Sequence, residues 1–192
     1  MNENHNGIED KWQNKQARLI LISFYFTQMI FILLSVSFLW WKGQLYAEVI
    51  PFADAHMWLI GICAGGLIVA LEFVLIRYVP QHHFDDGGIN QLLFARRSWW
   101  HILFIAIVAA IGEELLFRGV VQAWVGVWGT TLLFVLVHTR YLKKWVLVAF
   151  VAAVSLLFGY IVEWTHHLAP AIIAHASVDF IMGCYLRYAV KA

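Results

Sequence analysis

Charged residues are scarce in this sequence. Asp, Glu, Lys and Arg together make up 13% of its 192 residues, about half of their share in an average soluble domain. The formal net charge is only +1, and no basic stripe of the kind that a phosphate backbone requires runs along the chain. We therefore expect no nucleic-acid partner and no strongly acidic partner.

Cysteine and proline are also rare. The two cysteines, Cys63 and Cys184, both lie inside apolar runs, which is neither a disulfide framework nor the spacing of a metal-binding pair. We interpret both as packing residues. The three prolines fall near the ends of apolar runs, and no internal repeat or low-complexity tract is visible. A disulfide-stabilised domain and a repeat architecture are therefore not indicated.

Apolar residues, in contrast, make up 62% of the chain, more than a soluble domain of this size could hide from water. A helix needs about 20 apolar residues to cross the hydrocarbon core of a bilayer. The sequence thus predicts an all-α, polytopic membrane bundle of about six transmembrane helices. The predicted spans are 19–41, 57–79, 99–123, 127–142, 145–163 and 168–190.

The domain organisation follows from these spans. Residues 1–18 are polar and form a predicted cytoplasmic tail, and 19–192 form a single membrane domain. The first apolar run is too long for the core of a signal peptide, so we expect it to be retained. The fourth span is short and is expected to be tilted or partly re-entrant. Gly126 and Gly129 are expected to loosen its start.

Interfacial and basic residues predict the boundaries and the orientation. Nine of the ten tryptophans lie near predicted span ends, where amphipathic rings prefer the headgroup level. If the N-terminus is cytoplasmic, eleven of the 13 Lys and Arg residues fall on the cytoplasmic side, as the positive-inside rule requires. We therefore predict that both termini are cytoplasmic in a multi-pass protein of the cell membrane.

Several ionisable residues nevertheless lie within the predicted spans. Each costs on the order of 3 kcal/mol to insert, so such residues usually face the bundle interior and mark a functional site. The alternative is that they only pair with one another to hold the helices together. The residues are Glu72, Glu113, Glu114, Arg118, His138, His175 and Asp179.

The spacing of these residues separates their roles. Glu114 and Arg118 are four apart, so an ion pair on one helix face is expected. Glu113 points about 100° away from Glu114 and remains free for other work. His175 and Asp179 are also four apart, which places an imidazole and a carboxylate on one face of the last span.

The depth of these residues in the bilayer suggests that four of them can meet. Counted at about 1.5 Å per residue, Glu113, His138, His175 and Asp179 fall in one slab near the middle of the membrane. A carboxylate beside an imidazole can deprotonate a water molecule, and a second imidazole can stabilise an oxyanion. No Ser or Cys has an evident activating partner, so covalent catalysis is disfavoured.

Three short motifs carry a resemblance to a known family. The run from Glu113 to Gly119 resembles the Glu-Glu-x-x-x-Arg motif of the CPBP family, which includes the type II CAAX prenyl endopeptidases and bacteriocin-processing and self-immunity proteins. The run from Phe134 to His138 resembles its Phe-x-x-x-His motif, and His175 to Asp179 its His-x-x-x-Asn/Asp motif. The motifs occur in the family's order, and the resemblance covers about 99–182.

The resemblance implies a helical membrane fold and a glutamate-type endopeptidase. Glu113 and His138 would activate the water, and His175 with Asp179 would form the oxyanion site. Glu114 and Arg118 would support the pocket, together with Phe134 of the second motif. Asp179 departs from the prenyl-protein enzymes, which have an amide there. Because a carboxylate donates a hydrogen bond only when protonated, Asp179 either orients His175 or stays neutral.

Several alternatives remain open at this point. We expect no cofactor, although Glu113, His138, His175 and Asp179 are residue types that bind zinc; the HExxH run of common zinc proteases is absent. Glu72 either pairs with a cation in the bundle or extends the site.

The sequence leaves three hypotheses about the function. The preferred one is an intramembrane endopeptidase acting on a membrane-associated or lipidated peptide or protein. The second is a non-catalytic family member acting through protein contacts in bacteriocin self-immunity or envelope regulation. The third is a small transporter, which the absence of a visible inverted repeat disfavours.

Overall fold

The computed structural model describes residues 2–45, 50–83 and 86–189, which form helices joined by short turns, with no strand among them. The all-α prediction is confirmed. The longer helices are α1 (Asn2–Trp41), α3 (Ala55–Tyr78), α5 (Trp99–Glu114), α6 (Gln122–Val137), α7 (Trp145–Thr165) and α8 (Ala169–Ala189). The shorter ones are η1 (Ile50–Ala53), η2 (Gln81–His83), α4 (Ile89–Phe94), η3 (Leu115–Val121) and η4 (Thr139–Tyr141).

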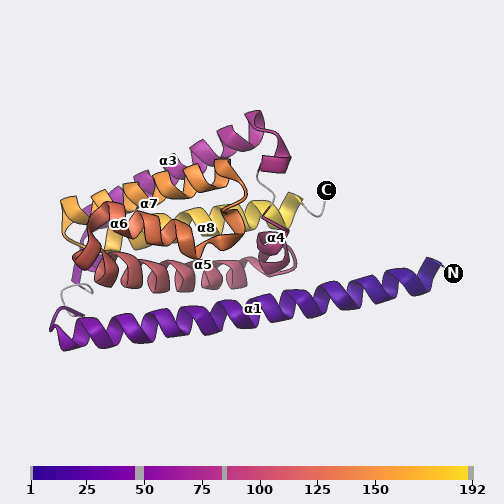
Figure 1. The fold of residues 1–192 in the computed structure, drawn as a ribbon, viewed down its shortest axis with the longest axis horizontal. Helices are drawn as coiled ribbons and strands as arrows, with labels where there is room; N and C mark the ends of the chain where they lie inside the picture. Colours follow the sequence, from indigo (N-terminus) through magenta and orange to yellow (C-terminus); the bar gives the residue numbers. More distant parts are fainter. Residues whose placement is uncertain (1, 46–49, 84–85, 190–192) are drawn as a thin grey trace.

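Helix α8 lies in the middle of the bundle, and α1 lies along its outside (Figure 1). α8 contacts α3, α4, α5 and α7, whereas α1 contacts α4, α5 and η3. The start of α1 and the end of α8 lie at the same end of the bundle (Figure 1). The helix that carries His175 and Asp179 is therefore the one around which most of the others pack.

Close approach of α3 and α8 depends on small residues. A Cβ at Gly61 would lie 2.7 Å from Cβ of Ile173, and a Cβ at Gly65 would lie 3.0 Å from the carbonyl oxygen of Ala174. Small residues at helix interfaces are typical of membrane bundles, where backbones must approach closely to gain packing contacts. This contact brings α3, and Glu72 with it, against the central helix.

Five helices of the described chain are long and apolar enough to cross a membrane, against the six spans of the prediction. The difference lies in the third and fourth predicted spans, which form one helical stretch, Trp99–Val137. This stretch is not straight, because Gly126 has a φ of 67° and a ψ of −179°, which is not helical. The backbone therefore breaks at the glycine expected to loosen this region.

After this break the chain returns toward its starting end. Asn90, at the start of α4, donates to the hydroxyl of Tyr141 over 3.4 Å, and Arg140 donates to the side-chain oxygen of Asn90 over 3.3 Å. The two ends of the stretch Trp99–Val137 thus lie at the same end of the bundle. The stretch is a hairpin of a longer and a shorter arm, and residues 127–137 fall short of the length that a full crossing needs.

The predicted end of the fourth span at residue 142 is wrong, since α6 ends at Val137. In a continuing α-helix the carbonyl of Phe134 would accept the backbone N–H of His138. Here that carbonyl lies 2.7 Å from Nδ1 of His138, and the backbone N–H of His138 donates to Val135 instead. The histidine side chain competes for the carbonyl and helps to end the helix.

Candidate active site

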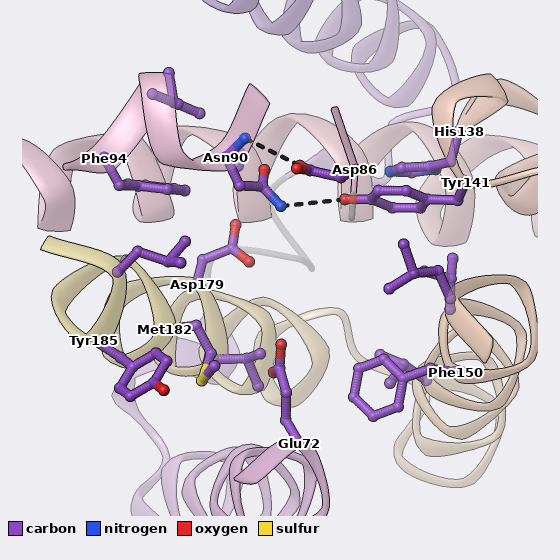
Figure 2. A pocket seen from close by; sticks show the side chains of 18 of the residues that line it. Glu72, Asp86, Asn90, Phe94, His138, Tyr141, Phe150, Asp179, Met182 and Tyr185 are labelled. Atoms are coloured by element: carbon purple, nitrogen blue, oxygen red, sulfur yellow. Dashed lines mark hydrogen bonds between the residues drawn. The ribbon is translucent and has the colours of Figure 1, made fainter. Parts of the chain in front are cut away.

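A cavity of about 990 Å³ lies between the helices. Residues of α3, α5, α6, α7 and α8 form its walls, together with the turns around α4 and η4. All four residues predicted to be catalytic line it: Glu113, His138, His175 and Asp179. Figure 2 shows His138, Asp179 and Glu72 around this cavity. The cavity is therefore shared by residues of α5 (Glu113), of α8 (His175 and Asp179) and of the turn that follows α6 (His138).

Glu114 and Arg118 are not among the residues that line the cavity. They form the ion pair that their spacing predicts. Oε1 of Glu114 lies 3.1 Å from Nη1 of Arg118, and both side chains are fully buried. Nη2 of Arg118 also donates to Oγ of Ser155 over 2.9 Å and to its carbonyl oxygen over 3.2 Å. The guanidinium lies over the ring of Phe134, 4.7 Å from its centroid. A buried charge is tolerated only when it is paired and hydrogen-bonded in this way.

The local backbone suits this arrangement. The seven residues Leu115–Val121 form a π-helical segment, η3, directly after Glu114. Such segments are uncommon within helices and occur frequently at functional sites, because they shift the direction of the side chains. Arg118 lies within η3, so the segment carries the guanidinium that pairs with Glu114.

His175 lies between two carboxylates. Its Nδ1 lies 2.8 Å from Oε1 of Glu114, and its Nε2 lies 3.6 Å from Oδ2 of Asp179. Because Oε1 of an ionised Glu114 can only accept, Nδ1–H of His175 is the donor. The ring also stacks on Phe158 at a centroid distance of 5.8 Å. The position of His175 is thus determined by residues of α5, α7 and α8.

Glu113 faces the cavity and has a partner that the sequence analysis missed. Nε2 of Gln28, on α1, donates to Oε1 of Glu113 over 3.0 Å. A Cβ at Gly112 would collide with Oε1 of Gln28, which shows that α1 and α5 approach closely here. An amide in the middle of the first apolar run was the available signal, but nothing in the sequence relates it to Glu113.

His138 is oriented by its own turn. With Nδ1–H donating to the carbonyl of Phe134 over 2.7 Å, the neutral ring keeps a lone pair on Nε2. The ring lies 4.6 Å from the ring of Phe134 and 5.5 Å from that of Tyr141, measured between centroids. The hydroxyl of Tyr141 accepts from Arg140 over 2.8 Å. Burial raises the pKa of Tyr141, so its hydroxyl stays neutral well above physiological pH.

Glu72 lines the same cavity from α3. Its Oε2 atom is buried and has no hydrogen-bond partner among the residues that the structure describes. The expectation that Glu72 pairs with a cation of the bundle therefore finds no support within those residues. The alternative, that Glu72 extends the site, agrees with its position.

Metal binding requires three or more ligand side chains that are grouped closely. Within residues 2–45, 50–83 and 86–189, no three His, Cys, Asp or Glu side chains are grouped closely enough to hold a metal ion. Glu113, His138, His175 and Asp179 share a cavity, but they do not form such a group. The arrangement does not fit the four-ligand zinc site that the sequence left open.

Comparisons with known proteins identify the family of the chain. A family model described as type II CAAX prenyl endopeptidase Rce1-like matches residues 95–181, which hold all three motifs. The uncharacterized protein YpbD of Bacillus subtilis (strain 168) is 38% identical over 128 residues, which cover 67% of this chain and 68% of YpbD. No solved structure matches the chain. The chain is a membrane protein that belongs to the CPBP family, the protease family of the type II CAAX prenyl endopeptidases.

Proposed function

We propose that this protein is an intramembrane endopeptidase that hydrolyses a peptide bond of a membrane-associated or lipidated protein in the cell membrane. The observation that carries the proposal is the cavity shared by Glu113, His138, His175 and Asp179. Each of these polar side chains is costly within a bilayer, and together they supply a base, an acid and donors for an oxyanion. Membership in a protease family supports the same reaction class.

Glu113 and His138 activate the water in this proposal. The Glu113 carboxylate accepts a proton from a water molecule, and the resulting hydroxide attacks the carbonyl carbon of the scissile bond. The C–N bond then breaks, and Glu113 passes the proton to the leaving amine, so the products are a carboxylic acid and an amine. Gln28 holds one carboxylate oxygen of Glu113. His138 offers Nε2 to the same water, because its Nδ1 is bound to Phe134.

His175 stabilises the oxyanion and Asp179 supports it. Since Nδ1–H of His175 donates to Glu114, the ring can donate to an oxyanion only through a protonated Nε2. A doubly protonated His175 is favoured by a carboxylate near each nitrogen, those of Glu114 and Asp179. Asp179 in this role remains ionised and orients His175, whereas an amide at this position would donate to the oxyanion directly.

The reaction is tested by reconstituting the protein in liposomes with a pool of synthetic apolar peptides and identifying fragments by mass spectrometry. Fragments are expected with the wild-type protein and are lost in Glu113→Ala and His138→Ala. Fragments of equal yield from all three proteins would contradict the mechanism. A cellular phenotype that survives both substitutions would instead favour a non-catalytic role through protein contacts.

A further inference from the structure

Glu72 is an ionisable residue of the cavity that the proposed chemistry does not use. It lies on α3, outside the matched residues 95–181. Figure 2 shows its side chain directed into the cavity from α3, with Phe150 of α7 and Met182 of α8 on the neighbouring walls. The Asp179 carboxylate on α8 is close enough to act on Glu72 electrostatically. Apolar residues that line the same cavity are Ile68, Leu75, Ile76, Val151, Val154 and Leu186.

The buried oxygen of Glu72 needs a donor. Oε2 has no hydrogen-bond partner among the described residues, and a buried acceptor without a donor is destabilising, more so when it is charged. A cation that carries hydrogen-bond donors, such as an ammonium or guanidinium group, forms strong charge-assisted hydrogen bonds with a carboxylate. A ligand that carries such a cation would therefore bind more tightly at this position.

Three basic side chains that line the cavity have partners other than Glu72. Arg140 donates to Asn90 and Tyr141. His175 is held by Glu114 and lies near Asp179. Nδ1 of His138 is bound to the carbonyl of Phe134. No ion pair of Glu72 with a residue of the described ranges is present, so those residues give this carboxylate no cationic partner.

We propose that Glu72 is a specificity-determining residue that binds the Lys or Arg side chain of an otherwise apolar peptide segment lying in the cavity. The inference rests on the proposed endopeptidase function, because it treats the occupant of the cavity as a peptide substrate. The apolar walls take the aliphatic stem of the basic side chain, and its charged end reaches the Glu72 carboxylate. The substrate class is then a membrane-associated peptide with a basic residue near an apolar stretch.

Binding without cleavage tests this directly. The Glu113→Ala protein in nanodiscs is titrated with two fluorescent peptides that are identical except for one Lys or norleucine within an apolar sequence. After subtraction of binding to empty nanodiscs, the Lys peptide is expected to bind roughly tenfold more tightly, as for one charged hydrogen-bonded pair. The added substitution Glu72→Gln is expected to remove this preference and to leave the norleucine peptide unaffected.

Glu163→Gln is the matched control, because Glu163 is an exposed carboxylate on α7, and it should keep the Lys preference. Thermal unfolding of each variant in detergent shows that the fold is retained. Equal binding of both peptides to the protein with Glu72, binding of neither, or a preference that persists in Glu72→Gln would overturn the inference. A Lys preference in Glu113→Ala, combined with a wild-type protein that cleaves no peptide, would instead contradict only the proposed function.

Discussion

Nδ1 of His175 donates to Oε1 of Glu114 over 2.8 Å, across 61 residues of sequence. The same oxygen accepts from Arg118 over 3.1 Å. One buried carboxylate therefore joins α5, η3 and α8, and it couples the ion pair that stabilises the wall to the imidazole that faces the cavity. The stability of the fold and the geometry of the site depend on the same atom.

Removal of the Arg118 charge should destabilise the bundle. Arg118→Met removes the guanidinium from the buried Glu114 carboxylate, and loss of one partner of a buried ion pair typically costs about 3–5 kcal/mol. The measurement is unfolding in detergent micelles by denaturant, followed through tryptophan fluorescence. Arg77→Met, at an exposed position on α3, is the matched control and should change little. Equal stability of the two variants would contradict the structural role of the ion pair.

Loss of the Gln28 amide should reduce catalysis more than stability. Gln28→Leu removes the donor to Glu113, and a hydrogen bond to a charged group is worth about 1.5–3 kcal/mol. We expect kcat/KM to fall at least roughly tenfold. Gln16→Leu makes the same change at an exposed position of α1 and should leave the cleavage rate unchanged. A Gln28→Leu protein with the wild-type rate argues against a role of α1 in the site.

Substitution of Gly126 should strain the hairpin. Its φ of 67° and ψ of −179° lie in a region that is essentially restricted to glycine, and a side chain there costs of order 1–3 kcal/mol. Gly126→Ala should therefore lower the melting temperature. Gly66→Ala is matched, because an added Cβ at either site meets no described atom within 4 Å, but Gly66 is helical. A similar melting temperature for both variants would show that the break is not required.

Tyr141 should position His138 through its ring and not through its hydroxyl. The two rings stack at 5.5 Å with an interplanar angle of 15°. Tyr141→Phe keeps this contact and should retain most of the activity, whereas Tyr141→Leu should reduce kcat with little change in KM. Steady-state kinetics on one cleaved peptide distinguish the two. Equal loss in both variants would assign the effect to the hydrogen bonds with Asn90 and Arg140.

Chelation of metal ions should leave the reaction intact, because the proposed water activation uses only Glu113 and His138. Incubation with 1,10-phenanthroline, followed by the liposome cleavage assay, is expected to give the untreated rate. Elemental analysis of the purified protein provides the independent readout. A rate that is lost on chelation and restored by zinc would contradict the proposed roles of these two side chains.

The sequence predicted best what depends on local spacing. The ion pair of Glu114 with Arg118 and the shared face of His175 and Asp179 follow from four-residue intervals on a helix. The similar depth of Glu113 and His138 in the membrane predicted that both could reach the same site. The two four-residue intervals are determined by helix geometry alone.

Contacts between distant helices were not predictable in the same way. Gln28 and Glu113 are 85 residues apart, and Glu72 meets the cavity only because α3 packs closely on α8. The end of α6 at Val137 depends on a hydrogen bond from the side chain of His138 to Phe134. Hydropathy carries no information about such a bond, so the predicted span 127–142 ends too late.

The most direct measurement is a comparison of new peptide termini in cell membranes that contain the wild-type protein, Glu113→Gln or Glu163→Gln at matched expression. Both substitutions remove one carboxylate, but only Glu113 lines the cavity. The account predicts termini that are present with wild type and Glu163→Gln and absent with Glu113→Gln. The same termini in all three membranes would contradict the claim that Glu113 activates the hydrolytic water.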